Sequence, residues 1–269
     1  MKIKLILTTL ILFAFIISTG CSSGGGDGDN TTPSSNACSQ LGLMTRIING
    51  TECSEVGSPV VQINLRLPTG DLGLCSGTLI TPTYVLTAAH CFFEDPIAAS
   101  VEVNGRLIPG SRFLVHPDVD IDSSSLVVLN DAAIIELSQP LTGVPTLPIL
   151  GSRSVNSGNI ISTFGYGQDE MGAVGVLQSG EMKVSEVNQT HIAARFDGDG
   201  SNPCFGDSGG PAILSFQDDN GADVDAVVGI VSSGELITCL SGDRTLFTNA
   251  TTSSVFDFIT RNVPGVSVK

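Results

Sequence analysis

The chain has 269 residues, enough for one large or two small all-β domains with a substantial core. Hydrophobic residues make up 41% of it and tryptophan is absent, so the core must consist mainly of valine, isoleucine and leucine. The formal net charge of −15 argues against a nucleic-acid partner, because binding would require basic residues that displace phosphate counterions. The acidity serves solubility or attracts cationic substrates.

The N-terminus is predicted to be an export signal. Lys2 and Lys4 precede an apolar run over residues 5–17, which is too short to span a bilayer comfortably and leads into small residues. Residues 17–21, Ile-Ser-Thr-Gly-Cys, resemble a bacterial lipobox, which implies that Cys21 is acylated and becomes the mature N-terminus. The alternative is an ordinary signal peptide followed by an incidental cysteine.

Residues 21–35 are rich in glycine, serine and aspartate and are predicted to form a flexible tether, because they cannot bury apolar surface. Cysteine usage agrees with export. If Cys21 carries lipid, six of the seven cysteines remain, an even number that can form disulfides in an oxidising compartment. The count alone leaves their pairing open.

From residue 59 onward, short β-rich runs recur between turn-forming residues, with no amphipathic helix between them. Such spacing favours an all-β sandwich or barrel. The predicted strands cover residues 60–67, 83–88, 100–103, 112–115, 132–137, 159–164, 181–187, 192–196, 211–216, 226–231 and 245–248.

The C-terminal end departs from this pattern. Within residues 254–263, Val255 and Phe258 follow helical spacing, and Thr252 or Ser253 is available as an N-cap. The sequence therefore predicts an all-β body closed by a C-terminal helix.

The first chemical motif is a serine between glycines, in residues 204–211, Cys-Phe-Gly-Asp-Ser-Gly-Gly-Pro. A tight turn of this kind presents the hydroxyl of Ser208 beside backbone N–H groups that point the same way, as a nucleophile next to an oxyanion hole requires. Taken alone, the pattern also fits a glycine-rich turn with an incidental serine.

A histidine stands where an apolar strand meets a loop, since residues 85–91 read Val-Leu-Thr-Ala-Ala-His-Cys. A lone histidine is more often structural. A nucleophilic serine, however, needs a general base from a distant segment, and His90 can provide it.

A carboxylate must then orient the imidazole. Asp131 begins an apolar strand, so its side chain should be desolvated and hydrogen-bonded, which suits this role. Asp118, Asp120 and Asp122 are nearby alternatives in a polar loop that no apolar strand follows.

The three segments, in the order His, Asp, Ser, resemble the chymotrypsin–trypsin family of serine proteases. Residues 87–91 and 206–211 match its two most specific motifs, and Asp131 matches its Asp-Ile-Ala-Leu-type strand. Residues 164–167, Phe-Gly-Tyr-Gly, resemble the aromatic–glycine turn before the middle strands of its second barrel. The resemblance extends from Ile47 to the C-terminus.

The resemblance implies an organisation in three parts. A signal peptide over residues 1–20 and a tether with an activation propeptide over residues 21–46 would precede a peptidase domain over residues 47–269. That domain would consist of two six-stranded antiparallel β-barrels, over residues 47–145 and 146–269, the second followed by the C-terminal α-helix. The active site would lie in the cleft between the barrels.

The implied activity is that of an exported serine endopeptidase that acts on proteins or peptides through an acyl-enzyme. Ser208 would attack the scissile carbonyl, His90 would take and return the proton, and Asp131 would hold the imidazole tautomer. The N–H groups of Gly206 and Ser208 would bind the oxyanion. The enzyme would be anchored by lipid to a bacterial membrane, facing the periplasm or the cell surface, or would be secreted.

Residues 46–50, Arg-Ile-Ile-Asn-Gly, resemble the zymogen cleavage site of the family. Cleavage between Arg46 and Ile47 by an activating protease would free an α-amino group that pairs with Asp207, because a buried carboxylate needs a cationic partner. This pairing would order the oxyanion turn.

The resemblance also implies two disulfides, Cys75–Cys91 and Cys204–Cys239. Cys38 and Cys53 are then left over, and we expect them to pair, so that the cleaved enzyme stays tied to its anchor. The alternative is that these two cysteines remain free or cross-link chains.

By resemblance, four residues form the specificity pocket: Asn202, Ser232, Gly234 and Thr245. Asn202 stands where trypsin-like members have an aspartate that selects Arg or Lys, so cleavage after basic residues is not expected. Threonine at position 245 resembles elastase-like members and would narrow the pocket, which favours small to medium apolar side chains. The alternative is that Asp243 approaches the pocket and restores a basic preference.

Two other classes of function compete with this hypothesis. One is a catalytically silent binding module on the same scaffold, although such modules generally lose the nucleophile or the base. The other is a lipoprotein esterase. In such enzymes the Gly-x-Ser-x-Gly elbow joins a strand to a helix. Residues 206–210, Gly-Asp-Ser-Gly-Gly, do not stand between a strand and a helix here, which disfavours this class. We expect no cofactor and no metal, because the three histidines are widely scattered and no acidic loop has ligand spacing.

Overall fold

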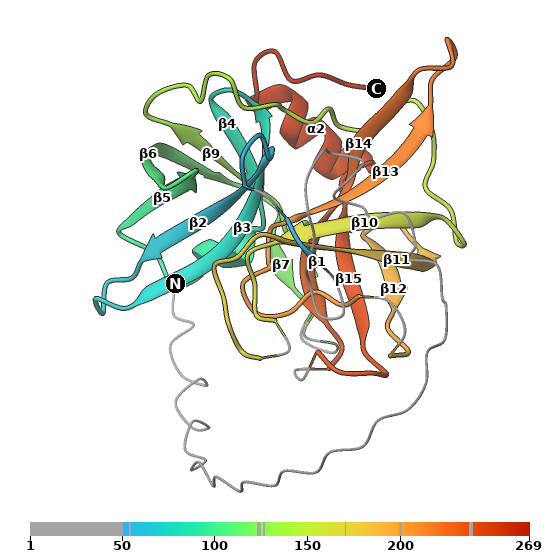
Figure 1. The fold of residues 1–269 in the computed structure, drawn as a ribbon, viewed down its shortest axis with the longest axis horizontal. Coiled ribbons are helices and arrows are strands. Elements are labelled where there is room, and N and C mark those ends of the chain that lie inside the picture. The colour runs from blue at the N-terminus through green and yellow to red at the C-terminus, as the bar shows by residue number, and fades with distance from the viewer. Residues whose placement is uncertain are drawn as a thin grey trace, which may run out of the picture. The chain divides into compact units, whose positions relative to one another are not determined.

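The computed structural model describes residues 51–269 except 54, 123, 124, 126, 170, 199, 200, 237 and 238. The predicted signal peptide, Cys21, Cys38 and the Arg46–Ile47 bond therefore lie outside the described residues. The described chain forms two closed six-stranded antiparallel barrels and one C-terminal α-helix, as predicted (Figure 1).

The first barrel closes in the order β2-β3-β4-β9-β6-β5. Its strands are β2 (Val60–Arg66), β3 (Leu72–Thr81), β4 (Tyr84–Thr87), β5 (Ala98–Val103), β6 (Arg106–Val115) and β9 (Ala133–Leu137). Inward-facing side chains such as Ile63, Val101 and Ile135 are fully buried and fill it. Closure leaves none of these strands with an unpaired edge.

The second barrel follows in sequence, and the pairing of β12 with β11 closes it in the order β11-β10-β13-β14-β15-β12. The short strand β1 (Thr51–Glu52) pairs with β11 outside this ring. The six barrel strands are β10 (Ile160–Gly165), β11 (Gln178–Val187), β12 (His191–Arg195), β13 (Pro211–Gln217), β14 (Asp223–Gly234) and β15 (Arg244–Asn249).

Four smaller elements complete the described structure: η1 (Ala89–Phe92), β7 (Asp120–Ile121), β8 (Val128–Leu129) and α2 (Ser253–Asn262). The helix α2 buries Val255, Phe258 and Ile259, which join the same hydrophobic core as the first barrel. Among the described residues, no helix has the length and apolar composition needed to cross a bilayer.

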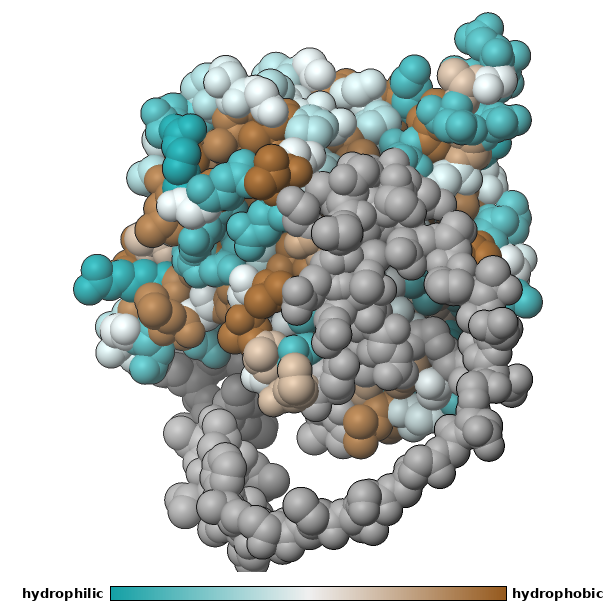
Figure 2. Space-filling view, viewed as in Figure 1, coloured by the Kyte–Doolittle hydropathy of each residue, from teal (hydrophilic) through white to brown (hydrophobic). Residues whose placement is uncertain are grey.

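Two hydrophobic cores support the fold. The first fills the first barrel and continues into Phe164, Ile213 and Ile230 of the second barrel, whereas the other fills the second barrel around Val228 and Phe247. On the face in Figure 2, hydrophobic and hydrophilic residues are interspersed over the surface. The continuous apolar contact between the barrels fixes the loops at their junction, where the candidate site lies.

Candidate active site

Strand pairing in the first barrel brings the predicted histidine and aspartate together. β4 and β9 run antiparallel with Thr87 opposite Ala133, so the chain after β4 and the chain before β9 emerge at the same end. η1 follows β4 and carries His90, and Asp131 lies just before β9. The two side chains therefore meet although 41 positions separate them.

The carboxylate of Asp131 holds His90 at two points. Its Oδ1 accepts the backbone N–H of His90 at 2.8 Å, and its Oδ2 lies 2.7 Å from Nδ1 of the ring. Oδ2 also accepts the hydroxyl of Ser232 at 2.5 Å. Asp131 is fully buried, whereas 23% of the His90 side chain is exposed. A carboxylate at Nδ1 fixes the proton on that nitrogen and leaves Nε2 as an acceptor.

The three alternative carboxylates lie elsewhere. Asp118 and Asp120 are exposed, and Asp122 is half-buried in the loop between β7 and β8. Of the four candidates, Asp131 is the one that binds His90.

Ser208 lies in the turn before β13, and contacts from both barrels hold this turn. The carbonyl oxygen of Ser208 accepts the N–H of Ser76 on β3 at 2.8 Å, and Gly209 donates its N–H to Val231 on β14 at 2.8 Å. Gly209 has φ +83°, and a Cβ there would lie 2.4 Å from the carbonyl oxygen of Ser76, so only glycine fits. Ser208 and His90 line the same pocket.

Two backbone donors lie in the same turn. Gly206 adopts φ +99°, a conformation that favours glycine, and its carbonyl oxygen accepts the hydroxyl of Ser76 at 2.8 Å. In the part of the chain that the structure describes, neither the N–H of Gly206 nor that of Ser208 donates a hydrogen bond. Both N–H groups are therefore available to a ligand beside Ser208.

The side chain of Asp207 is buried in the second barrel, with 1% of the residue exposed. Its Oδ1 accepts the N–H of Gly167 at 2.8 Å and its Oδ2 accepts the N–H of Cys204 at 2.9 Å. Burial raises the pKa of Asp207 to about 6, and these two hydrogen bonds oppose the rise. Among the described residues, no cationic side chain pairs with it.

The structure forms two of the expected disulfides at this junction. Cys75–Cys91 joins β3 to η1, beside His90, and Cys204–Cys239 joins the turn that carries Ser208 to the loop after β14. Cys53 is buried and disulfide-bonded. Its expected partner, Cys38, lies outside the described residues.

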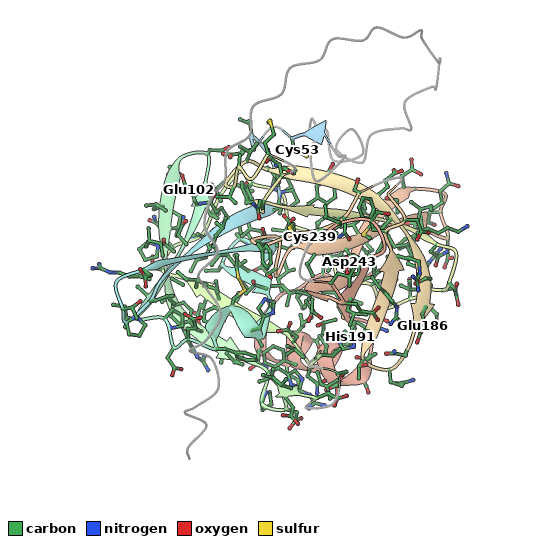
Figure 3. All side chains as sticks on the ribbon, turned by 90° about the horizontal axis from the view of Figure 1, so that it is seen from below. Cys53, Glu102, Glu186, His191, Cys239 and Asp243 are labelled. Atoms are coloured by element: carbon green, nitrogen blue, oxygen red, sulfur yellow. A yellow bond between two sulfur atoms is a disulfide. The ribbon has the colours of Figure 1, made fainter. Side chains whose placement is uncertain are left out.

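A pocket opens beside Ser208 at the end of the second barrel. Of the four residues predicted for the specificity pocket, Ser232, Gly234 and Thr245 line it, whereas Asn202 is fully buried and lies behind the lining. Asp243 also lines the pocket, close to Cys239 (Figure 3). The structure thus places a carboxylate in the pocket, as in the alternative named from the sequence, because hydrogen bonds from the backbone and from Asn202 hold Asp243 inward.

The family model for trypsin matches residues 47–259. The chain belongs to the trypsin family of serine endopeptidases. It is 30% identical to the brachyurin of Leptuca pugilator over 205 residues, which cover 67% of this chain and 84% of that protein. It is 29% identical to a trypsin of Phaedon cochleariae over 190 residues, which cover 60% and 68% of the two chains.

A solved structure of HL collagenase shares the fold, with a TM-score of 0.63 and 22% sequence identity. The match covers 82% of this chain and 97% of that chain. This trypsin-family chain thus has the same fold as nearly the whole length of that relative.

Two serines of this trypsin-family chain position the site in ways that the sequence did not indicate. Ser76 donates its hydroxyl to Gly206 and accepts the N–H of Tyr166 at 2.9 Å, so it links the turn that carries Ser208 to both barrels. Ser232 was expected in the pocket but not as a donor to Asp131. The sequence held one indication for Ser76. It follows Cys75, which was expected to form a disulfide with Cys91, the neighbour of His90, so Ser76 was expected to lie near the site.

Proposed function

We propose that this chain hydrolyses peptide bonds in proteins through an acyl-enzyme, with Ser208 as the nucleophile, His90 as the general base and Asp131 as the group that orients it. The observation that carries the proposal is the 2.7 Å contact between Nδ1 of His90 and Oδ2 of Asp131, together with the pocket that His90 and Ser208 both line. A nucleophile, a base and an orienting carboxylate from three segments are what acyl transfer requires.

The chemistry follows from this geometry. Because Nδ1 carries its proton toward Asp131, Nε2 of His90 can take the proton of the Ser208 hydroxyl as Oγ attacks the substrate carbonyl carbon. The resulting oxyanion would accept the N–H groups of Gly206 and Ser208, and each such donor lowers the barrier by about 3 kcal/mol. His90 then protonates the leaving amine, and water, deprotonated by the same imidazole, releases the acid from Ser208.

We infer that the chain is made as a zymogen cut between Arg46 and Ile47. Register supports a short path from the new N-terminus to Asp207. Glu52 pairs with Gln178, and Gln178 pairs with Gly165 on its other side. A Cβ on Gly165 would lie 2.1 Å from Oδ1 of Asp207, so the end of β10 touches this carboxylate.

The buried state of Asp207 supports the same inference. Ile47 is five residues before Glu52, a separation that extended chain spans with about 17 Å. A carboxylate whose pKa burial raises to about 6 is costly to ionise without a cation. The α-ammonium of Ile47 would supply that charge and hold the turn that carries Gly206 and Ser208.

We also propose export, retention by lipid on Cys21, and a disulfide between Cys38 and Cys53. The Cys75–Cys91 and Cys204–Cys239 disulfides fit an oxidising compartment, which supports export. Strand β1 begins at Thr51 on the second barrel, so the Cys53 end of such a link is fixed to the peptidase domain. The tether would then survive cleavage at Arg46.

The expectation of cleavage after small apolar residues rested on Asn202 and on Thr245, and Thr245 lines the pocket. Asp243 in the same lining supports the alternative, a preference for basic residues. A catalytically silent binding role gains no support, because the candidate nucleophile, base and orienting carboxylate are all present in one site.

Hydrolysis of a denatured protein mixture tests the proposal. We expect enzyme cut after Arg46 to release new peptides, and His90→Ala to slow this release by about 1,000-fold or more. The uncut chain should be much less active than the cut one. Equal activity of the His90→Ala variant would contradict the assignment of the base.

A further inference from the structure

Asp243 is a buried carboxylate that the proposed mechanism does not use. It is 1% exposed, and it lines the pocket that also contains His90 and Ser208. It directly precedes β15 and does not belong to the segment before Ser208. Its position at the pocket makes it a candidate for substrate selection.

Neutral donors alone hold this carboxylate. Oδ1 accepts the N–H groups of Leu236 at 2.8 Å and Arg244 at 2.7 Å, and Oδ2 accepts Nδ2 of Asn202 at 3.0 Å. An ionised carboxylate has about four acceptor positions, so three hydrogen bonds leave capacity on Oδ2.

The side-chain amide of Asn202 that binds Asp243 is itself held by two further hydrogen bonds. Its Nδ2 also donates to the carbonyl oxygen of Cys239 at 3.2 Å, and its Oδ1 accepts the hydroxyl of Thr245 at 2.6 Å. The amide therefore fixes the carboxylate from behind and adds no charge to the pocket.

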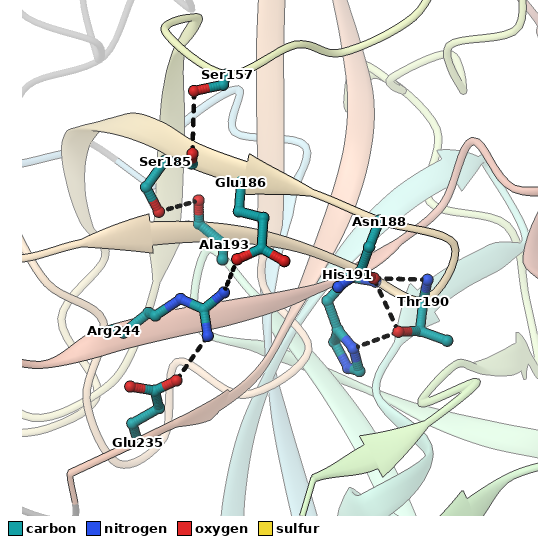
Figure 4. Close-up of polar contacts among 9 residues, drawn as sticks. All are labelled: Ser157, Ser185, Glu186, Asn188, Thr190, His191, Ala193, Glu235 and Arg244. Carbon is teal, nitrogen blue, oxygen red and sulfur yellow. Dashed lines mark hydrogen bonds and ion pairs between the residues drawn. The ribbon is translucent and has the colours of Figure 1, made fainter.

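The nearest arginine in sequence does not neutralise Asp243. The guanidinium of Arg244 binds Glu235 and Glu186, each at 2.6 Å (Figure 4). Among the described residues, no cationic side chain forms an ion pair with Asp243. A buried charge without a counter-ion is costly, and a cationic ligand would repay that cost.

The remaining lining suits the stem of a long cationic side chain. Val231, Leu236 and Phe205 supply apolar surface, and the Cys204–Cys239 disulfide also borders the pocket. Gly234 lies against the carboxylate, since a Cβ there would be 2.8 Å from Oδ2 of Asp243. An alkyl stem along apolar walls with its charge at a carboxylate is how lysine and arginine bury.

We propose that Asp243, supported by Asn202, is the specificity-determining residue of this enzyme and binds the ammonium or guanidinium of a Lys or Arg that precedes the scissile bond. The inference rests on the proposed function for the cleavage step, whereas the cation site itself does not depend on catalysis. The net charge of −15 favours approach of the same cationic substrates.

The site can be measured without catalysis by binding of p-aminobenzamidine to the Ser208→Ala chain, cut after Arg46 with trypsin that is then removed. We expect Asp243→Asn in this background to weaken binding by about tenfold or more, the usual effect of losing a charged partner. Asp223→Asn, at the far end of β14, removes the same charge outside the pocket and should leave binding unchanged.

Because Asp243→Asn places an amide against the amide of Asn202, a swapped variant guards against misfolding. Asn202→Asp with Asp243→Asn keeps a donor and an acceptor across the same contact but moves the carboxylate behind the lining, beside the carbonyl oxygen of Cys239. We expect it to fold and to bind benzamidine more weakly than the parent. Binding that is absent in the parent, or unaffected by Asp243→Asn, would overturn the proposal.

Peptides that differ only before the scissile bond complete the test. With active enzyme we expect kcat/KM to favour Arg and Lys over Ala and Leu, and Asp243→Asn to reduce cleavage of the basic peptides alone, by about tenfold or more. Cleavage only after apolar residues would overturn the specificity proposal and leave the protease assignment intact. Benzamidine binding that depends on Asp243, without cleavage of any peptide, would support the cation site and overturn the proposed function.

Discussion

The hydroxyl of Ser232, on β14 of the second barrel, donates to Oδ2 of Asp131 across 2.5 Å. Asp131 precedes β9 of the first barrel and uses the same oxygen to face Nδ1 of His90. One carboxylate oxygen thus receives a hydrogen bond from each barrel. The geometry of the base therefore depends on how the barrels pack together, not on the first barrel alone.

Replacing Ser232 with alanine should weaken the orientation of His90. The buried carboxylate of Asp131 would lose one of its hydrogen bonds, and loss of a bond to a charged group costs about 1.5–3 kcal/mol. We expect kcat to fall by about tenfold or more with a smaller change in KM, measured on one peptide. Ser232→Thr, which keeps a hydroxyl, should recover part of the loss. An unchanged kcat in the alanine variant would contradict this role.

The buried Asp207 should make the uncut chain less stable as the pH rises. Its pKa is about 6 in the folded state against an ordinary 3.8. Between about pH 4 and pH 6 the folded chain therefore holds a proton on Asp207 that the unfolded chain has lost. The free energy of unfolding is therefore highest below about pH 4 and falls by about 3 kcal/mol in all as the pH rises through about 6.

Urea unfolding of the Ser208→Ala chain across this pH range measures the effect. Asp207→Asn should flatten the pH dependence, whatever its effect on absolute stability. The cut chain should show a weaker decline than the uncut chain, because the ammonium of Ile47 favours the ionised carboxylate. The same slope with and without Asp207 would contradict the assignment.

If Asp243 selects basic residues, the enzyme should process its own precursor, because Arg46 precedes the proposed activation bond. The full Ser208→Ala chain should stay uncut on storage and be cleaved after Arg46 when a trace of active enzyme is added. Active enzyme that carries Asp243→Asn should cleave it more slowly, by about tenfold or more. N-terminal sequencing of the product gives the cut site. Precursor left intact by enzyme that cleaves arginine peptides would contradict self-processing.

The proposed Cys38–Cys53 link predicts the behaviour of the cut enzyme in electrophoresis. Without reductant, the segment from Cys21 to Arg46 should remain attached to the peptidase domain, and with reductant it should separate. Cys38→Ala should separate in both conditions. Separation of the unaltered chain without reductant would refute the tether.

The sequence predicted the strands well where apolar residues alternate, as in β2, or follow one another, as in β9. It predicted them poorly where packing between strands decides. β3 was missed because Gly73 and Gly77 interrupt its apolar pattern. A Cβ at Gly77 would lie 2.6 Å from Cγ1 of Val85, so glycine there serves close packing on β4 and not a turn. That requirement exists only after the barrel has closed.

The same limit applies to the site. His90, Asp131 and Ser208 could be proposed because each stands in a motif with its own local signal. Asp243 could be named only as an alternative, because its inward turn depends on Asn202, 41 positions away. The donor role of Ser232 depends on the contact between the barrels. Hydrogen bonds of this kind join distant segments and leave no periodicity in the sequence.

Covalent labelling with a fluorophosphonate tests the central claim most directly, because the reagent reacts with a serine that a neighbouring base activates. The chain cut after Arg46 should take up one label, which peptide mass spectrometry should locate at Ser208. His90→Ala should label far more slowly, and Ser208→Ala should not label at all. A cut chain that takes up no label, or takes it up on another serine when Ser208 is absent, would contradict the account.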